Sequence, residues 1–227
     1  VEQPTEGVIH IDGLQKDQLN PRLSAAAGIM VIFQDFSLFP NLTVAENIAF
    51  ACQLTQHQKW FRKRNARTVA TAALERIGVD IPIDDCVESL PVAHKQLVAI
   101  ARALASEARL IIMDEPTTAL TEREVRSLLR IIRMLKEDGV AVVFVSHKLA
   151  EVLEVSERVV VLRNGCKVTE GPAEEFDTTS LTRHMTGRDV PEHPPNALIE
   201  TPETLMQVRN LNKEGSFYDV SFDIRKG

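Results

Sequence analysis

Three short apolar runs, separated by helical patterns, limit the architectures open to this chain. Leu110–Met113 and Val140–Val145 are unbroken apolar runs of strand length, and Gly28–Phe33 is a third. Between the first two, apolar residues from Val125 to Ile132 recur at the spacing of one helix face. Strand, helix and strand in this order predict an α/β fold with a parallel sheet covered by helices. Continuous apolar runs are typical of strands buried on both faces.

Two capping boxes mark helix starts, because a threonine precedes a glutamate by three residues in each. Thr43 and Glu46 predict a helix that begins at Val44, and Thr121 and Glu124 predict another. The first of these helices opens a long segment whose pattern is mostly helical and which we expect to form a subdomain.

The remaining pattern is a mixture of helix and hairpin. The helical subdomain is predicted over about 44–105, and a short helix is predicted over Leu149–Val155. Arg158–Arg163 and Lys167–Thr169 flank Asn164-Gly165, a dipeptide that favours a tight turn between antiparallel strands. The sheet core is therefore expected to have an antiparallel part beside it.

The composition limits the kinds of partner. The 227 residues carry a formal net charge of -6, which argues against a surface built mainly for nucleic acid or anionic lipid. The 3 cysteines lie far apart, which predicts reduced thiols in a cytoplasmic protein rather than disulfides or a zinc site. No apolar stretch approaches the roughly 18 residues that predict a transmembrane helix.

Polar residues whose side chains could bind ligands or take part in catalysis follow the predicted strands. Ligands of parallel α/β sheets bind at the carboxyl ends of the strands. The residues at those ends are Gln34, Asp114, Glu115, Ser146 and His147.

The Asp114-Glu115 pair has two interpretations. A carboxylate at a strand tip can hold Mg²⁺, and a second one can act as a general base toward water. The alternative is an ordinary buried strand that ends in a solvated acidic turn. The segment Pro116–Leu120 that follows disfavours this alternative. A lone histidine is more often structural, but the place of His147, just past a strand and after Asp114-Glu115, favours a functional role.

Several segments resemble the ATP-binding domain of ABC transporters. Met113–Thr121 is similar to the Walker B motif and D-loop, and Val143–His147 is similar to the switch-histidine segment. Val31–Gln34 and Leu42–Ile48 are similar to the Q-loop and the helix after it. The resemblance covers about residues 1–190. It implies an ABC-type P-loop ATPase fold with a mostly parallel core sheet, an antiparallel β part and a helical subdomain.

The resemblance also implies roles for residues, with ATP and Mg²⁺ as ligands. Asp114 and Gln34 would bind Mg²⁺, Glu115 would be the general base, and His147 would donate a hydrogen bond to the γ-phosphate. Thr121 stands where the family often has aspartate. Either residue can cap the next helix, but the contact that this loop makes across a dimer of ATPase domains would change.

The signature motif is where the chain departs from the family. In place of Leu-Ser-Gly-Gly-Gln it has Leu90, Pro91, Val92, Ala93 and His94. The family's serine donates a hydroxyl to the partner domain's ATP, and its glycines let the backbone approach the phosphate closely. Proline has no hydroxyl, and the next two residues add side chains. We expect a weakened composite ATP site.

No phosphate-binding loop of the form G-x-x-x-x-G-K-S/T occurs in the chain. Val220–Gly227 resembles the strand that precedes such a loop in a second domain. We therefore expect tandem domains: residues 1–190 as a first ATPase domain without its phosphate loop, 191–202 as a proline-rich linker, and 203–227 as the start of a second ATPase domain. A chain without the loop is expected to be inactive alone.

Tandem ATPase domains with degenerate signatures resemble the ATPase subunits of bacterial importers for ribose, xylose, galactose and related sugars. This resemblance implies transmembrane permease subunits and a second ABC ATPase domain as partners, and indirectly a periplasmic sugar-binding protein. Nucleic acid is not an expected partner. The implied location is cytoplasmic, peripheral on the inner face of the cell membrane.

Two other functions stay open on the sequence. One is a soluble tandem ABC ATPase that acts on ribosomes or nucleic acid, and the other is a regulatory module that has lost catalysis. The short proline-rich linker favours the transporter over the first. The basic run Lys59–Arg67 is predicted to be a solvated helix face, with contact to a permease as the alternative.

Overall fold

The computed structural model describes residues 5–16, 19–56, 63–187 and 203–225, and the side chains of 51–56 and 63–64 are left aside. The chain divides into two compact units, Val1–Met185 and Thr186–Gly227. The predicted linker, and residues 59–62 of the basic run, lie outside the described residues.

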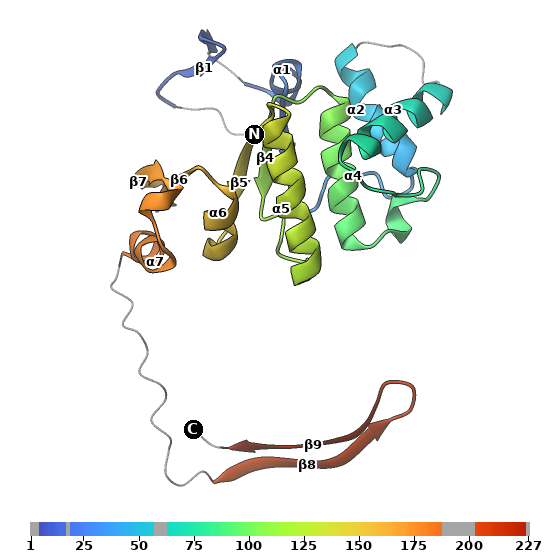
Figure 1. Cartoon of the computed structure of the whole chain (residues 1–227), viewed down its shortest axis with the longest axis vertical. Helices are drawn as coiled ribbons and strands as arrows, with labels where there is room; N and C mark the ends of the chain where they lie inside the picture. Colours follow the sequence, from blue (N-terminus) through green and yellow to red (C-terminus); the bar gives the residue numbers. More distant parts are fainter. Residues whose placement is uncertain (1–4, 17–18, 57–62, 188–202, 226–227) are drawn as a thin grey trace. The chain divides into compact units, whose positions relative to one another are not determined.

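The elements of the first unit are named here in chain order (Figure 1). They are β1 (Ile9–Ile11), β2 (Leu14–Lys16), α1 (Pro21–Ala26), β3 (Ile29–Ile32), α2 (Val44–Gln56), α3 (Lys63–Arg76), η1 (Val87–Ser89), α4 (Val92–Ala105), β4 (Leu110–Asp114), α5 (Glu122–Glu137), β5 (Ala141–Val145), α6 (Leu149–Val155), β6 (Arg158–Arg163), β7 (Cys166–Pro172), η2 (Ala173–Glu175) and α7 (Thr178–Thr186). The second unit holds β8 (Thr204–Lys213) and β9 (Phe217–Arg225).

A three-stranded parallel sheet of order β3-β4-β5 forms the centre of the first unit. Ile32 lies opposite Met113, and Met113 lies opposite Phe144, so the three strands end at the same edge. Strand-helix-strand order and a mostly parallel core confirm the α/β prediction.

The side chains of β5 alternate between exposed and partly buried positions. Val142 and Phe144 pack against the main apolar core, whereas Val143 and Val145 are each 45% exposed. Within the described residues, helices cover only one face of this strand. An apolar run shows that a strand is hydrophobic, but it does not show which elements cover each face.

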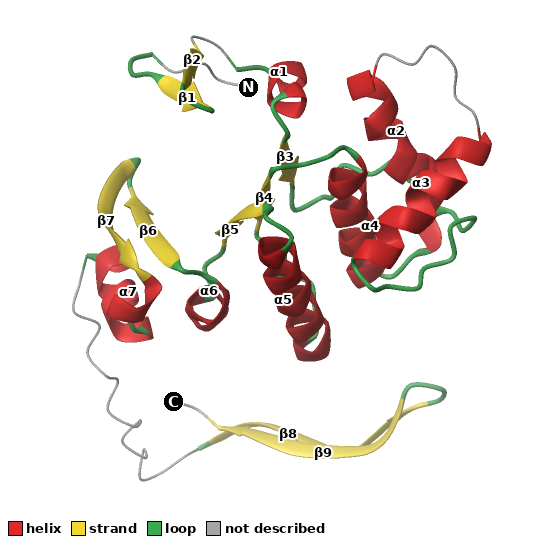
Figure 2. Ribbon diagram, turned by 45° about the horizontal axis from the view of Figure 1, so that its top comes forward, coloured by secondary structure: helices red, strands yellow, loops and turns green. Residues whose placement is uncertain are grey.

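The predicted helical region contains α2, α3 and α4, which pack on one another beside the sheet (Figures 1 and 2). The Thr43 backbone N–H donates to Glu46 Oε2 at 3.0 Å, and the Glu46 N–H donates to Thr43 Oγ1 at 3.2 Å. The predicted start at Val44 is therefore confirmed, because this reciprocal pair satisfies backbone donors that a helix start leaves free.

The second capping box also forms, at the start of α5. The predicted apolar face of α5 is buried, with Leu128 and Leu129 among its least exposed side chains. The helix ends before Gly139, whose φ of +80° suits the left-handed position after a helix. This face ties α5 to the core that supports the sheet.

Antiparallel hairpins complete the first unit. β6 and β7 pair around Asn164-Gly165, and both turn residues have positive φ, as a tight hairpin turn requires. β7 extends beyond the predicted Lys167–Thr169. The hairpin, α6 and α7 share a small core that includes Val161 and Leu181 (Figure 2). Neither α7 nor α1 was predicted, since both helices are short.

The second unit is a β8–β9 antiparallel hairpin, with Met206 opposite Ile224 and Val208 opposite Phe222. β9 begins before the strand-like segment that starts at Val220 and ends at Arg225. None of the helices described is long and apolar enough to cross a membrane.

Candidate active site

The carboxyl edge of the sheet gathers most of the residues singled out from the sequence. Asp114 is the last residue of β4 and lies opposite Val145, the last residue of β5. His147 follows β5 by two residues, and Gln34 follows β3 by two. Because the strands are parallel and in register, these side chains arise from one edge.

Glu115 and His147 are in direct contact. The His147 Nδ1 lies 2.8 Å from Glu115 Oε1 and 2.7 Å from Glu115 Oε2. The Glu115 side chain is 27% exposed and the His147 side chain is 62% exposed, so the pair lies open to solvent on the histidine side. The two residues come from adjacent strand ends that are 32 positions apart in the sequence.

The Glu115 backbone is held in an uncommon conformation. Its φ is +49°, in the left-handed region that a residue with a Cβ adopts at a steric cost. The Glu115 N–H donates to the Val145 carbonyl at 2.9 Å, which extends the β4–β5 ladder by one bond. Sheet pairing and the side-chain contact with His147 together hold this conformation.

The surroundings of Glu115 keep its carboxyl group ionised. The hydrogen bond with His147 lowers its pKa most, and the Thr118 hydroxyl, which donates to Oε2 at 3.1 Å, lowers it further. Partial burial acts in the opposite direction and is outweighed. The carboxylate is thus an acceptor that is already engaged by two neighbours.

A second set of contacts ties the loop after Glu115 to the start of α6. The Thr117 side chain is 0% exposed, and its hydroxyl donates to Glu151 Oε2 at 2.5 Å. The Lys148 ammonium donates to the Thr117 carbonyl at 2.9 Å and lies 3.4 Å from Glu151 Oε1. We call Thr117, Lys148 and Glu151 the loop clamp. It joins the segment after Glu115 to the residue after His147.

No sequence pattern predicts the loop clamp. Thr117 was noted only as part of a motif, and Glu151 only as part of a predicted helix. The available signal was a lysine and a glutamate three positions apart at a helix start, directly after His147. That spacing places two side chains on one helix face, but it does not identify Thr117 as their partner.

The signature-like residues gather at a different place, the start of α4. Leu90 is buried, and Pro91 is the N-cap of α4 and contributes no side-chain hydrogen bond. A pocket of about 450 Å³ between the starts of α4 and α5 is lined in part by Pro91, Ala93, His94 and Thr121.

Val92 is 40% exposed at the first position of α4. The Val92 side chain therefore stands on the surface of the helix start. Thr121 caps α5 through its backbone and hydroxyl contacts with Glu124, each 2.8 Å long.

A divalent cation of the Mg²⁺ class fits the oxygen groups of Asp114 and Gln34 in chemical type. Both residues are exposed at the sheet edge. A carboxylate and an amide carbonyl are hard oxygen ligands, and Mg²⁺ in phosphate sites takes few protein ligands beside water and phosphate. Over the described ranges there is no cluster of three His, Cys, Asp or Glu residues that could enclose a metal by itself.

The chain is similar to known proteins in sequence and in fold. The profile of the family described as ABC transporter matches residues 1–118. Ribose import ATP-binding protein RbsA 1 of Rubrobacter xylanophilus is 44% identical over 99% of this chain, and RbsA 2 of Streptomyces avermitilis is 38% identical over 100% of it. In both cases the match spans 45% of the relative, so this chain covers less than half the length of these curated relatives.

A solved structure described as the dimeric post-hydrolysis state of an ATP-binding cassette, bound to ADP and Pi, is also similar. It superposes with a TM-score of 0.64 at 28% sequence identity, covering 77% of this chain and 77% of that one. The α/β arrangement described above is thus the fold of a known nucleotide-binding protein.

Proposed function

The chain belongs to the ABC transporter family, and we propose that it is part of the ATP-hydrolysing, energy-coupling subunit of a bacterial sugar importer. The observation that carries the proposal is the contact between Glu115 and His147 at the carboxyl edge of β4 and β5. The names of the relatives support a ribose-type sugar as the transported substrate. No observation favours the alternative of action on ribosomes or nucleic acid.

In the proposed reaction, water attacks the terminal phosphorus of ATP, the bond from that phosphorus to the ADP oxygen breaks, and Glu115 accepts the proton of the water. The lowered pKa of Glu115 keeps it in the carboxylate form that a base requires. His147 occupies both carboxylate oxygens in this structure. These contacts run through Nδ1 alone, and the carboxylate keeps further lone pairs that can accept a proton.

Asp114 and Gln34 would hold Mg²⁺ at the strand edge. An ion bound there would neutralise part of the negative charge of the phosphates. The residues at the start of α4 and Thr121 are proposed to face the ATP of a partner ATPase domain. With Pro91 in place of serine, the start of α4 offers backbone N–H groups but no hydroxyl.

These 227 residues contain no phosphate-binding loop, and we propose that they do not turn over ATP alone. The proposed partners in the complete system are a second ABC ATPase domain, transmembrane permease subunits and, indirectly, a periplasmic sugar-binding protein. The proposed location is the cytoplasmic face of the membrane, held there by the permease.

The proposal is tested with the full-length protein that carries this chain, assembled with its permease in vesicles. Glu115→Gln should lower ATP turnover and ribose uptake by at least about 100-fold, because general bases typically contribute 10²–10⁴-fold. ATP binding should persist, since glutamine keeps the shape of the side chain.

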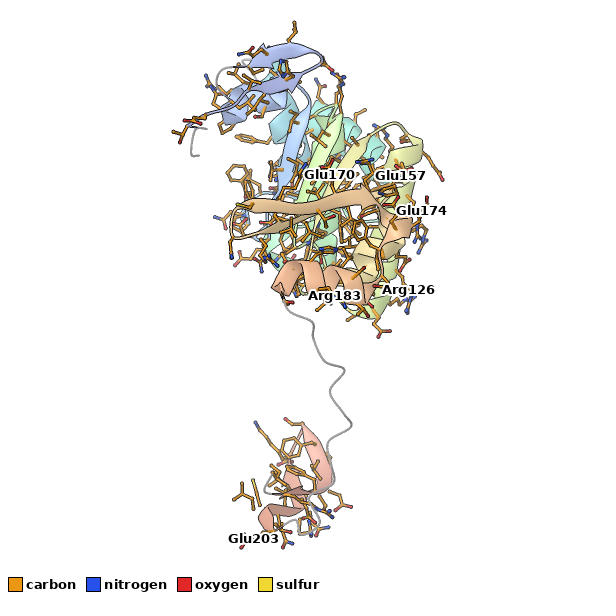
Figure 3. The ribbon with its side chains drawn as sticks, turned by 90° about the vertical axis from the view of Figure 1, so that its left-hand side faces the viewer. Arg126, Glu157, Glu170, Glu174, Arg183 and Glu203 are labelled. Carbon is orange, nitrogen blue, oxygen red and sulfur yellow. The ribbon has the colours of Figure 1, made fainter. Side chains whose placement is uncertain are left out.

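Glu174→Gln is the matched control. Glu174 is an exposed residue of η2 and is labelled in Figure 3. This variant should keep wild-type turnover and uptake. Equal turnover in Glu115→Gln and wild type would contradict the role of Glu115, and wild-type turnover without uptake of any pentose or hexose would contradict the importer.

A further inference from the structure

Arg102 connects α4 to the loop that follows Gln34. Its Nη1 donates to the Ser37 carbonyl at 2.6 Å, and its Nη2 donates to the Phe36 carbonyl at 2.9 Å. The guanidinium group is partly buried, and burial lowers the pKa of Arg102. No carboxylate of the described residues forms an ion pair with it. Two loop carbonyls thus accept hydrogen bonds from a partly desolvated guanidinium group.

The two carbonyls belong to residues in an unfavourable backbone conformation. Phe36 has a φ of +61° and Ser37 has a φ of +46°, and both carry side chains that disfavour the left-handed region. Consecutive residues of this kind persist only where the surroundings hold them. Asp35 supplies part of the restraint, because its Oδ1 accepts from the Ser37 N–H at 3.2 Å and from the Ser37 hydroxyl at 3.1 Å.

The side of the turn that faces α4 depends on Arg102. Ala101 and Ala103, its neighbours in α4, are 0% and 1% exposed, so the helix around Arg102 is fixed in the core. Arg102 lies ten positions after Val92, about 15 Å along the same helix from the signature-like start. A shift of α4 as a rigid rod would therefore move the donors that hold the turn.

We propose that Arg102 is the positioning residue that holds the turn at Phe36 and Ser37, and thereby sets the place of Gln34 relative to α4. The fork of a guanidinium group can donate to both carbonyls at once, which a lysine ammonium cannot do with the same geometry. Because the Arg102 hydrogen bonds connect α4 to the turn, a displacement of α4 would break these bonds and the turn would lose its conformation. The consequence for ATP turnover rests on the proposed function, whereas the holding of the turn does not.

The test of the turn uses amide hydrogen exchange in the full-length protein. The Phe36 N–H donates to the Phe33 carbonyl and the Ser37 N–H donates to Asp35, so both amides report on the turn. In Arg102→Met they should exchange at least about tenfold faster than in wild type, because the left-handed conformation loses its support. In Arg102→Lys the exchange rates of both amides should lie between those of wild type and those of Arg102→Met.

Arg126→Met is the matched control. Arg126 is an exposed arginine on α5, labelled in Figure 3, whose ion pair is with Glu122 on its own helix. It should leave both amides unchanged. Unchanged exchange of Phe36 and Ser37 in Arg102→Met, with α4 still protected, would overturn the proposal. If that variant does not fold, Arg102→Lys gives the same decision, since unchanged exchange there also overturns it.

A second variant separates support of the turn from general stability. Ser37→Gly removes the steric cost of the positive φ and the hydroxyl bond to Asp35, and it keeps the bond from the backbone N–H of residue 37 to Asp35. The turn should then need less support, so Arg102→Met should accelerate exchange by a smaller factor in the Ser37→Gly background than in wild type. An equal factor in both backgrounds would show that Arg102 acts through the core and not through the turn, and would also overturn the proposal.

ATP turnover of the full-length protein gives the functional readout. Arg102→Lys should lower kcat several-fold with little change in KM for ATP, because Gln34 would be misplaced while the phosphate loop is untouched. Turnover absent from wild type itself would contradict the proposed function and leave the exchange result to decide the role of Arg102. Faster exchange with unchanged kcat would overturn the link to Gln34.

Discussion

At the scale of single residues, Glu115 combines backbone strain with side-chain contacts that only the folded chain provides. A left-handed conformation costs a residue with a side chain about 1–2 kcal/mol. The bond to the Val145 carbonyl and the contacts with His147 and Thr118 offset this cost. Strained residues of this kind cluster at functional sites. The strain of Glu115 is consistent with a carboxylate that must be held in one position.

The ionisation of Glu115 can be measured directly. Its pKa in the folded chain should lie below the ordinary glutamate value of about 4.3, because His147 and Thr118 donate to the carboxylate. The unfolded chain then binds more protons between the two pKa values, so stability falls as the pH drops through the folded pKa. Carboxyl-carbon NMR titration gives the value.

His147→Ala should raise the pKa of Glu115 toward its ordinary value and weaken this pH dependence. His184→Ala is a control of the same type at a histidine in α7. A pKa of Glu115 that does not respond to His147→Ala would show that another group causes the shift.

The loop clamp makes a prediction about stability. Thr117→Val removes the hydroxyl that donates to Glu151 and keeps the side-chain shape. A hydrogen bond to a charged group contributes about 1.5–3 kcal/mol, and the free energy of unfolding in urea should fall by an amount in that range.

Two further variants check the loop clamp. Thr71→Val, at an exposed position of α3, should cost well under about 1 kcal/mol, as surface substitutions do. Glu151→Ala and Thr117→Val should be less than additive in combination, because they remove the same hydrogen bond. Additive losses would mean that the two residues stabilise the chain independently.

At the scale of elements, the starts of α4 and α5 differ in the way they are capped. α5 begins with a reciprocal capping box between Thr121 and Glu124, and the sequence was sufficient to predict it. α4 begins after Pro91, which provides no side-chain acceptor. A proline before a helix is compatible with the backbone geometry, but it leaves the first N–H groups of α4 free of side-chain caps.

Restoring the family pattern at the start of α4 tests the weakened composite site. Pro91→Ser, Val92→Gly and Ala93→Gly in the full-length protein should raise ATP turnover, because a hydroxyl donor and a closer backbone become available to the partner's nucleotide. The turnover number at saturating ATP is the measurement. Val168→Gly, an exposed position in β7, is the control for adding glycine. No gain from the triple variant would contradict the assignment.

At the scale of the whole molecule, the chain contains the strand-edge residues of the proposed nucleotide site but no phosphate-binding loop. The full-length protein should bind a non-hydrolysable ATP analogue at least about 100-fold more tightly than these 227 residues do. Two charge-assisted hydrogen bonds to phosphate account for that ratio, at about 1.4 kcal/mol for each factor of ten. Isothermal calorimetry gives both constants, and similar constants would contradict the proposed need for the loop.

The elements themselves were largely predictable, because they depend on local patterns. Apolar runs identified β3, β4 and β5, and the capping boxes identified the starts of α2 and α5. The pairing of Glu115 with His147 was expected only as a shared edge, since strand order follows from connectivity. The roles of the strand-edge residues and the division into 1–190, 191–202 and 203–227 stay predictions.

Contacts between segments distant in the sequence required the tertiary structure. The loop clamp joins Thr117 to Glu151 across 34 positions, and Arg102 reaches the Phe36 carbonyl across 66. No periodicity encodes such pairs, because each depends on how separate elements pack. The exposure of Val143 and Val145 in β5 also required the tertiary structure, because local hydrophobicity cannot specify which elements cover a strand. The strands, the helices and the carboxylates at the strand ends can thus be predicted from local sequence patterns. Which side chains contact one another is decided by how the elements pack in the tertiary structure.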